Sequence, residues 1–214
     1  MKELTVSKIN IEENDFENIF LSMRDYTSNS IDSVSWDKFN YKPAVDFCIA
    51  YRLNNIYIHY RINEKYIMAK TNVNNGDVWK DSCVEFFVAP ENDGVYYNFE
   101  FNCIGVILLA AGISRNNREY ASDLIIQKIY TKSTLGNISF EETTGDFNWE
   151  LSIIIPSECF FKHKIYNLEN KIFKANFYKC GNGLKIPHYL SWNIIKTPAP
   201  DFHMPEHFGI LKFN

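Results

Sequence analysis

Two glutamates that could do chemistry lie in neighbouring stretches of alternating sequence. Glu85 falls in the run CVEFFV and Glu100 in the run YNFEFN, where Asn102 shares its face of the predicted strand. Cleavage of a glycosidic bond needs two carboxylates about 5–10 Å apart across the sugar. The two glutamates predict such a pair if their strands are neighbours. Surface charge, or hydrogen bonding to a ligand, is the simpler interpretation.

Two tryptophans stand at the ends of predicted strands among polar residues. Trp79 lies in GDVWKDS, between a turn and a strand, and Trp192 lies in YLSWN, shortly before a proline-rich segment. Sugars present patches of C–H that stack on aromatic faces, while polar neighbours bind their hydroxyls. Both positions therefore predict sugar contacts, although a place in the core or at the edge of a sheet explains them equally well.

Other polar motifs are weaker signals. Arg115 and Arg118 lie in the loop sequence SRNNRE, where guanidinium groups could bind hydroxyls or carboxylates, or simply be solvated. The segment from His203 to His207 fits the metalloprotease pattern H-x-x-E-H, which requires a helix. Pro205 inside the motif argues against that helix, so no metalloprotease is expected.

The secondary-structure elements that must position these residues are predicted to be mostly strands. Period-two alternation runs through 56–62, 83–88, 97–103 and 149–155, and Asn- and Gly-rich turns separate these runs. One amphipathic helix is predicted near the start, capped by Asn14, with Phe16, Ile19, Phe20 and Met23 on one face. The pattern predicts an all-β fold, an antiparallel two-sheet β-sandwich of immunoglobulin or jelly-roll type with one short N-terminal helix.

Composition limits the class of protein. The 214 residues are expected to form a single domain over 1–214, and their formal charge of −4 lacks the basic surplus of a nucleic-acid binder. No apolar stretch is long enough for a membrane span, and the N-terminus has no export segment. The sequence as written predicts a cytoplasmic protein, or a periplasmic or extracellular one if a signal peptide was removed.

The five cysteines form no C-x-x-C pair, which argues against a zinc knuckle or a thioredoxin-like site. Cys48, Cys83, Cys103 and Cys159 lie inside apolar runs, where a small buried hydrophobic role is expected.

Several segments together resemble the carbohydrate-binding module family 9-like proteins, above all the standalone branch of Bacteroides-type bacteria. The resemblance runs from about Val45 to the C-terminus and rests on residues 78–88, 96–105, 176–181, 190–193 and 205–211. Its strongest parts are W-x-D-S-x-V-E-x-F, which begins at Trp79, and the closing W…P-x-x-F-G-x-L, which begins at Trp192.

The resemblance implies a two-sheet sandwich related to the DOMON-like folds. It also implies that two tryptophans clamp a sugar at a chain end, with Trp79 and Trp192 matching the clamp positions and Glu85 the acidic hydroxyl ligand. Glu100 and Asn102 lie on the next strand, where the family places further polar contacts. The family includes modules with structural calcium, but no acidic loop of this sequence can be assigned to calcium, and no cofactor is predicted.

The leading hypothesis is a non-catalytic module that binds a mono- or oligosaccharide and supports polysaccharide breakdown. Its expected ligand contacts are Trp79, Trp192, Glu85, Glu100, Asn102, Arg115 and Lys179, with no nucleic-acid or membrane partner. Two alternatives stay open, namely a glycoside hydrolase that uses Glu85 with Glu100, and a protein-interaction domain with a flat apolar surface.

Overall fold

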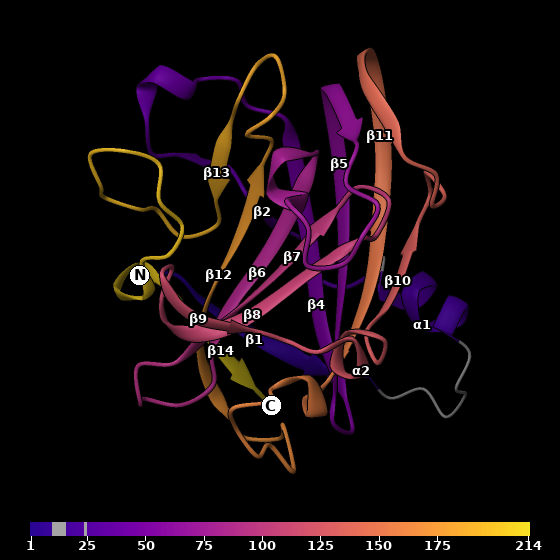
Figure 1. The fold of residues 1–214 in the computed structure, drawn as a ribbon. Helices are drawn as coiled ribbons and strands as arrows, with labels where there is room; N and C mark the ends of the chain where they lie inside the picture. Colours follow the sequence, from indigo (N-terminus) through magenta and orange to yellow (C-terminus); the bar gives the residue numbers. More distant parts are fainter. Residues whose placement is uncertain (10–15, 24) are drawn as a thin grey trace.

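A computed structural model of the chain describes residues 1–9, 16–23 and 25–214. Fourteen strands form the framework of this part of the chain, and they are joined by turns and longer loops (Figure 1). The strands are β1 (Glu3–Lys8), β2 (Asn29–Ser30), β3 (Ser33–Val34), β4 (Ala44–Arg52), β5 (Asn55–Ala69), β6 (Cys83–Ala89), β7 (Tyr96–Asn102), β8 (Ile107–Ser114), β9 (Asn117–Tyr120), β10 (Tyr130–Ser133), β11 (Phe140–Pro156), β12 (Ile172–Cys180), β13 (Tyr189–Ser191) and β14 (Gly209–Phe213).

The helices of the described part are short. They are α1 (Phe16–Met23), α2 (Asp123–Ile126) and the 3₁₀ turns η1 (Asp37–Phe39), η2 (Val78–Lys80), η3 (Ser157–Cys159) and η4 (Pro205–His207). The predicted apolar face of α1 is confirmed, because Ile19, Phe20 and Met23 are buried against the outer side of β4 and β5. The predicted cap, Asn14, lies outside the described residues. Within the described ranges no helix has the length and apolar character needed to cross a membrane.

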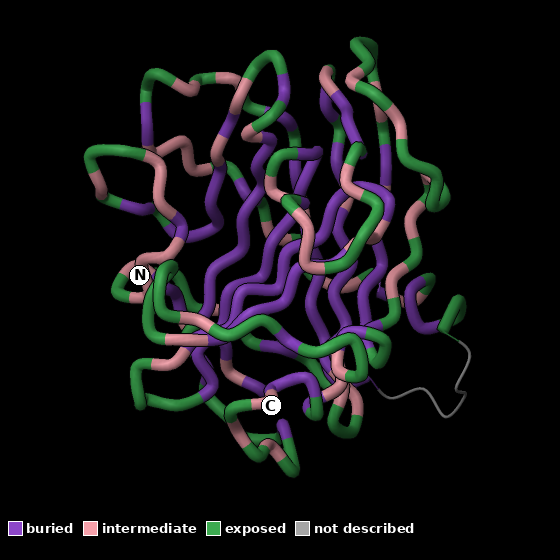
Figure 2. The backbone as a smooth tube through the Cα atoms, viewed as in Figure 1, coloured by how far each residue is buried: buried purple, intermediate pink, exposed green. Residues whose placement is uncertain are grey.

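The strands form two layers with the main hydrophobic core between them. One layer has the order β10-β11-β5-β4, and the other has the order β14-β12-β6-β7-β8-β9. Inward-facing residues such as Phe47 of β4, Ile58 of β5, Phe86 of β6, Phe99 of β7 and Phe177 of β12 meet in one cluster. Figure 2 shows the central strands as continuously buried, with the exposed residues concentrated in the loops. The predicted all-β sandwich is confirmed in this respect.

The prediction that all strands are antiparallel is wrong. Strand β1 pairs in parallel with β14 through Glu3–Val6 and then in parallel with β4 through Ser7 and Lys8. Because β1 passes from one layer to the other, the fourteen strands of the described chain form a single hydrogen-bonded sheet rather than two separate ones. Period-two alternation identifies strands but carries no information about the direction of their neighbours.

A second apolar cluster covers the outer face of the layer that contains β6, β7 and β12. Side chains that point away from the main core, including Phe87, Tyr96 and Tyr178, pack there against Phe202 and Phe208 of the segment after β13. Strands buried on both faces read as nearly continuous apolar runs, and β6 and β7 are buried at every position. This second layer of packing frames the cavity described next.

Candidate functional site

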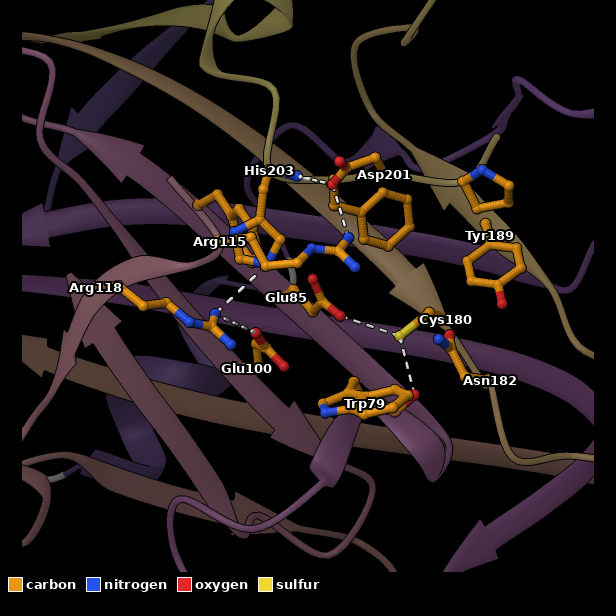
Figure 3. A pocket seen from close by; sticks show the side chains of 13 residues that line it. Trp79, Glu85, Glu100, Arg115, Arg118, Cys180, Asn182, Tyr189, Asp201 and His203 are labelled. Atoms are coloured by element: carbon orange, nitrogen blue, oxygen red, sulfur yellow. Dashed lines mark hydrogen bonds and ion pairs between the residues drawn. The ribbon is translucent and has the colours of Figure 1, made fainter. Parts of the chain in front are cut away.

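A cavity of about 200 Å³ opens on the outer face of β6, β7 and β12, beneath the segment that follows β13 (Figure 3). Aromatic rings, carboxyl groups and guanidinium groups share its walls. The lining residues are Trp79, Glu85, Phe87, Glu100, Arg115, Arg118, Cys180, Asn182, Tyr189, Pro200, Asp201, Phe202 and His203.

Trp79 is carried by η2 and held in place from two sides. Its carbonyl oxygen accepts a hydrogen bond from the Asn182 amide at 3.2 Å, and the Cys180 sulfur lies 3.5 Å from the same oxygen. A Cβ at Gly183 would lie 2.8 Å from the Lys80 carbonyl oxygen, so glycine is what permits this close approach of the two backbones. The indole is partly exposed at the cavity, and the Lys80 ammonium lies 5.0 Å from its ring centroid. The backbone at Trp79 is therefore held in place, and its indole forms one wall of the cavity.

Glu85 and Glu100 form the polar floor. They are direct partners in the pairing of β6 with β7, and only 2% and 3% of their surfaces are exposed. Glu85 Oε1 accepts a hydrogen bond from the Cys180 thiol at 3.0 Å, and Glu100 Oε1 accepts one from the Asn98 amide at 2.9 Å. Among the described residues, the buried Glu100 Oε2 has no hydrogen-bond partner. The floor thus offers an unsatisfied polar atom beside the cavity.

Burial changes the protonation of both glutamates. Loss of hydration raises the pKa of Glu100 to about 7, although the Arg118 guanidinium at 3.9 Å acts in the opposite direction. Burial raises the pKa of Glu85 well above its usual range, and the nearby Cys180 and Glu100 raise it further. Near pH 7 Glu85 is therefore biased toward its neutral form, and Glu100 is partly ionised.

The wall opposite Trp79 is charged. In Figure 3 Glu85 lies between the Trp79 indole on one side and Arg115, Asp201 and His203 on the other. Arg115 Nη2 donates to Asp201 Oδ1 at 2.7 Å, and the same oxygen accepts from the His203 amide at 2.9 Å. Burial, reinforced by the neighbouring guanidinium charges, lowers the pKa of His203 to about 3, so its imidazole is neutral at pH 7.

Three predicted ligand residues do not line this cavity, namely Trp192, Lys179 and Asn102. Trp192 is 3% exposed in the main core, where its ring meets Phe177 edge-on at 5.8 Å between centroids. Lys179 points into the interior toward β5, because the alternation of β12 turns Tyr178 and Cys180 to the cavity face. The expected clamp of Trp79 with Trp192 is therefore not assembled at this cavity.

Lys179 and Asn102 instead hold the surrounding structure together. The Lys179 ammonium lies 2.8 Å from Glu64 Oε2 and 2.9 Å from His188 Nε2, fully buried. Asn102 donates from Nδ2 to Asp81 Oδ2 at 3.0 Å and accepts the Val106 amide at Oδ1 at 2.9 Å. Since Asp81 follows η2 directly, Asn102 helps to fix the segment that carries Trp79.

Of the remaining predictions, Glu85, Glu100, Arg115 and Trp79 do come together. The sequence did not single out Asn182, Tyr189, Asp201 or Phe202 as site residues, and His203 was considered only within its H-x-x-E-H pattern. That pattern forms the three-residue turn η4 instead of a catalytic helix. A signal was present, because the Pro-rich stretch after β13 carries polar and aromatic residues with no strand or helix periodicity.

Comparison with known proteins supports a carbohydrate-binding family. The family model described as "Carbohydrate-binding family 9" matches residues 15–213. A crystal structure of a "putative carbohydrate-binding protein" from Bacteroides uniformis is 39% identical, with a TM-score of 0.95, over 100% of this chain and 99% of that one. Comparison with the curated proteins gives no match.

Two more distant structures show the same fold. Both are of a family 9 module from Caldicellulosiruptor kristjanssonii. The complex with glucose has 14% identity and a TM-score of 0.55, over 100% of this chain and 96% of that one. The complex with cellotriose has 13% identity and a TM-score of 0.57, over 100% and 94%. With the match over residues 15–213, the chain belongs to carbohydrate-binding family 9.

Proposed function

We propose that this chain is a non-catalytic module that binds one sugar ring of a mono- or oligosaccharide in the cavity beside Trp79. The observation that carries the proposal is a partly exposed indole facing a floor of buried carboxyl groups. Family membership supports carbohydrate as the ligand class. The glucose and cellotriose complexes of structurally similar modules support a glucose-type ligand.

The aromatic contact would come from Trp79, with Tyr189 and Phe202 closing the apolar part of the cavity. A volume of about 200 Å³ is below the range of about 300–1,000 Å³ typical of drug-sized ligands. A single ring therefore fits the enclosed space better than a long chain, whose further units would extend outside it. Trp192 has no place in this arrangement, and its proposed role is to support the core.

The polar contacts would come from Glu85, Glu100, Arg115 and Arg118. A hydroxyl group of the sugar can donate to the unsatisfied Glu100 Oε2, which removes the cost of a buried polar atom without a partner. Arg115 and Arg118 supply donors for the sugar oxygens. A neutral hydroxyl-rich ligand suits this mixture of donors and acceptors better than an apolar partner surface does.

We favour binding over hydrolysis for the glutamate pair because the chain belongs to a carbohydrate-binding family. Direct partners on adjacent antiparallel strands have Cβ atoms about 4.5–5.5 Å apart, so spacing alone does not exclude a retaining hydrolase. Such an enzyme needs one ionised carboxylate as its nucleophile. Here burial biases Glu85 toward the neutral form, whereas Glu100, with a pKa of about 7, is partly ionised at neutral pH. The two protonation states are compatible with either function, and an assay of cello-oligosaccharide hydrolysis with Glu85→Gln separates the two functions.

Calorimetric titration with glucose and cellotriose tests the proposal. Stacking of a ring on an aromatic side chain contributes about 1–3 kcal/mol by analogy with base stacking, so Trp79→Ala should weaken binding at least fivefold. The matched control is Trp192→Phe, which should leave the affinity within twofold. Equal affinity of wild type and Trp79→Ala would contradict the proposal, and release of glucose from cello-oligosaccharides by wild type but not by Glu85→Gln would support the hydrolase instead.

A further inference from the structure

Two cysteines that are far apart in the sequence meet under the floor of the cavity. Cys83 begins β6 and Cys180 ends β12, and the two residues are direct partners in the antiparallel pairing of these strands. Glu85 lies two positions along β6, on the same face. One ligand atom from each of Cys83, Glu85 and Cys180 lies within 4.8 Å of the others.

The distances are close to those of a tetrahedral metal site. Glu85 Oε1 is 3.0 Å from the Cys180 sulfur and 3.9 Å from the Cys83 sulfur. A tetrahedral zinc ion, with Zn–S of about 2.3 Å and Zn–O of about 2.1 Å, places sulfur and oxygen ligands about 3.6 Å apart and two sulfurs about 3.8 Å apart. The observed sulfur-to-oxygen distances lie on either side of that value, and the two sulfurs lie within 4.8 Å of each other.

We propose that Cys83, Cys180 and Glu85 bind one thiophilic divalent cation, with zinc preferred, whose fourth coordination position faces the cavity. Two thiolate ligands favour zinc over the oxygen-seeking calcium and magnesium ions. Glu85 and Cys180 line the cavity, which gives the ion a route to the site. Three ligands of the protein plus one open position is the arrangement of zinc sites that accept a water molecule or a ligand.

Metal binding at this site displaces protons from the ligand side chains. The S–H bonds of Cys83 and Cys180 break, two metal–sulfur bonds form, and the two protons pass to the buffer; no electrons move. The carboxyl of Glu85 releases its proton in the same way when it is protonated. Thiolates and carboxylates bind metals in their deprotonated forms, so metal binding at this site should release protons.

The surroundings offset part of the negative charge that three anionic ligands bring. The Lys179 ammonium acts electrostatically on both thiols, and the Arg115 guanidinium acts on the Glu85 carboxyl. Lys179 itself is anchored to Glu64 at 2.8 Å.

Cobalt(II) is the probe for this site because cobalt–thiolate bonds give an intense near-ultraviolet charge-transfer band. The full chain, reduced and freed of metal with a chelator, should bind one equivalent of Co²⁺ with this band, and Zn²⁺ should displace it. Cys83→Ser and Cys180→Ser should each weaken cobalt binding at least tenfold, as should Glu85→Gln, which keeps both thiols. Cys103→Ser is the matched control, since Cys103 is buried in the main core, and it should leave the band unchanged.

The result does not depend on the sugar proposal. Trp79→Ala should lose sugar but keep the cobalt band, whereas Cys83→Ser should lose the band but keep sugar, since Cys83 does not line the cavity. Absence of a thiolate band in wild type overturns the metal site, and so does an equal band in the Cys83→Ser, Cys180→Ser double variant. If the serine variants fail to fold by circular dichroism, the wild-type titration and Glu85→Gln still decide the question.

Discussion

Glu85 of β6 and Glu100 of β7 lie directly opposite each other, and both carboxyl groups are buried beneath the same cavity. Two like charges at this spacing repel each other, and burial removes the water that would stabilise them. A neutral carboxyl group donates one hydrogen bond and also accepts, whereas an ionised one only accepts. The pair can therefore present both donors and acceptors to a ligand near neutral pH.

The raised pKa of Glu100 predicts that the protein loses stability as the pH rises. Its pKa in the folded chain is about 7, compared with about 4.3 for an unperturbed glutamate. Between these values the folded state binds more protons than the unfolded state, so the free energy of unfolding falls with increasing pH. The fall should be at most about 4 kcal/mol and should be complete about one unit above pH 7.

Urea unfolding at pH 5 and pH 8 measures this effect. Glu100→Gln cannot ionise and should show a smaller loss between the two pH values than wild type. Because burial also raises the pKa of Glu85, part of the loss should remain in this variant. An unchanged pH dependence in Glu100→Gln would show that Glu100 ionises normally in the folded protein.

Arg118, in the short strand β9, should contribute substantially to ligand binding. Its guanidinium lies 3.9 Å from the Glu100 carboxylate, with only 14% of the side chain exposed. A hydrogen bond to a charged group contributes about 1.5–3 kcal/mol, so Arg118→Ala should weaken sugar binding about tenfold or more.

Calorimetry with cellotriose measures this change. The control is Arg61→Ala, because Arg61 lies on the other layer and donates to Ser28 there. Similar affinities for the two alanine variants would mean that Arg118 does not contact the sugar.

Replacing only one partner of the buried ion pair between Lys179 and Glu64 should strongly destabilise the protein. Both side chains are fully buried, and Glu64 Oε1 also accepts the Trp149 indole at 2.8 Å. Removing one partner of a buried pair typically costs about 3–5 kcal/mol. Lys179→Met should therefore lower the free energy of unfolding by that amount in urea titrations.

The double variant Glu64→Gln, Lys179→Met should recover much of the loss. It removes both charges and keeps an acceptor for the indole. A Lys179→Met variant as stable as wild type would argue against this interpretation.

Substitutions at Trp192 and Gly209 should have non-additive effects on the free energy of unfolding, and they should leave ligand binding unchanged. A Cβ at Gly209 would lie 2.4 Å from Trp192 Cζ3 and 2.7 Å from the Lys2 carbonyl oxygen. Gly209→Ala should cost about 1–3 kcal/mol through overpacking. In a double-mutant cycle with Trp192→Phe the two penalties should not add, because the smaller ring relieves part of the clash. Additive penalties would place the strain at Lys2 instead.

Sequence patterns predicted the strands and the all-β class well because alternation reports which side of a strand faces the core. They also brought Glu85 and Glu100 to one site, since each alternates onto the face opposite the core-facing phenylalanines. The ligand roles expected for Trp192 and Lys179 rested on position in the chain and on the family resemblance, and neither reveals which layer a side chain packs against. Both faces of this layer are buried, so polarity alone could not separate the cavity face from the core face.

No pattern in the sequence could predict which distant segments come into contact. Asp201 and His203 reach the cavity because a segment without periodicity folds back over β12, and Cys83 meets Cys180 because β6 pairs with β12. The parallel pairs of β1 depend on strand order, which alternation does not encode.

The passage of β1 between the layers has a consequence for how the chain folds during synthesis. Residues 3–6 find their partners in 210–213, at the opposite end of the sequence. Pairings of such long range contribute to a high contact order and slow folding. Residues 3–6 must therefore wait until β14 has left the ribosome, whereas Ser7 and Lys8 can pair with β4 earlier. The two layers are joined through β1 and β14 only after β14 has been synthesised.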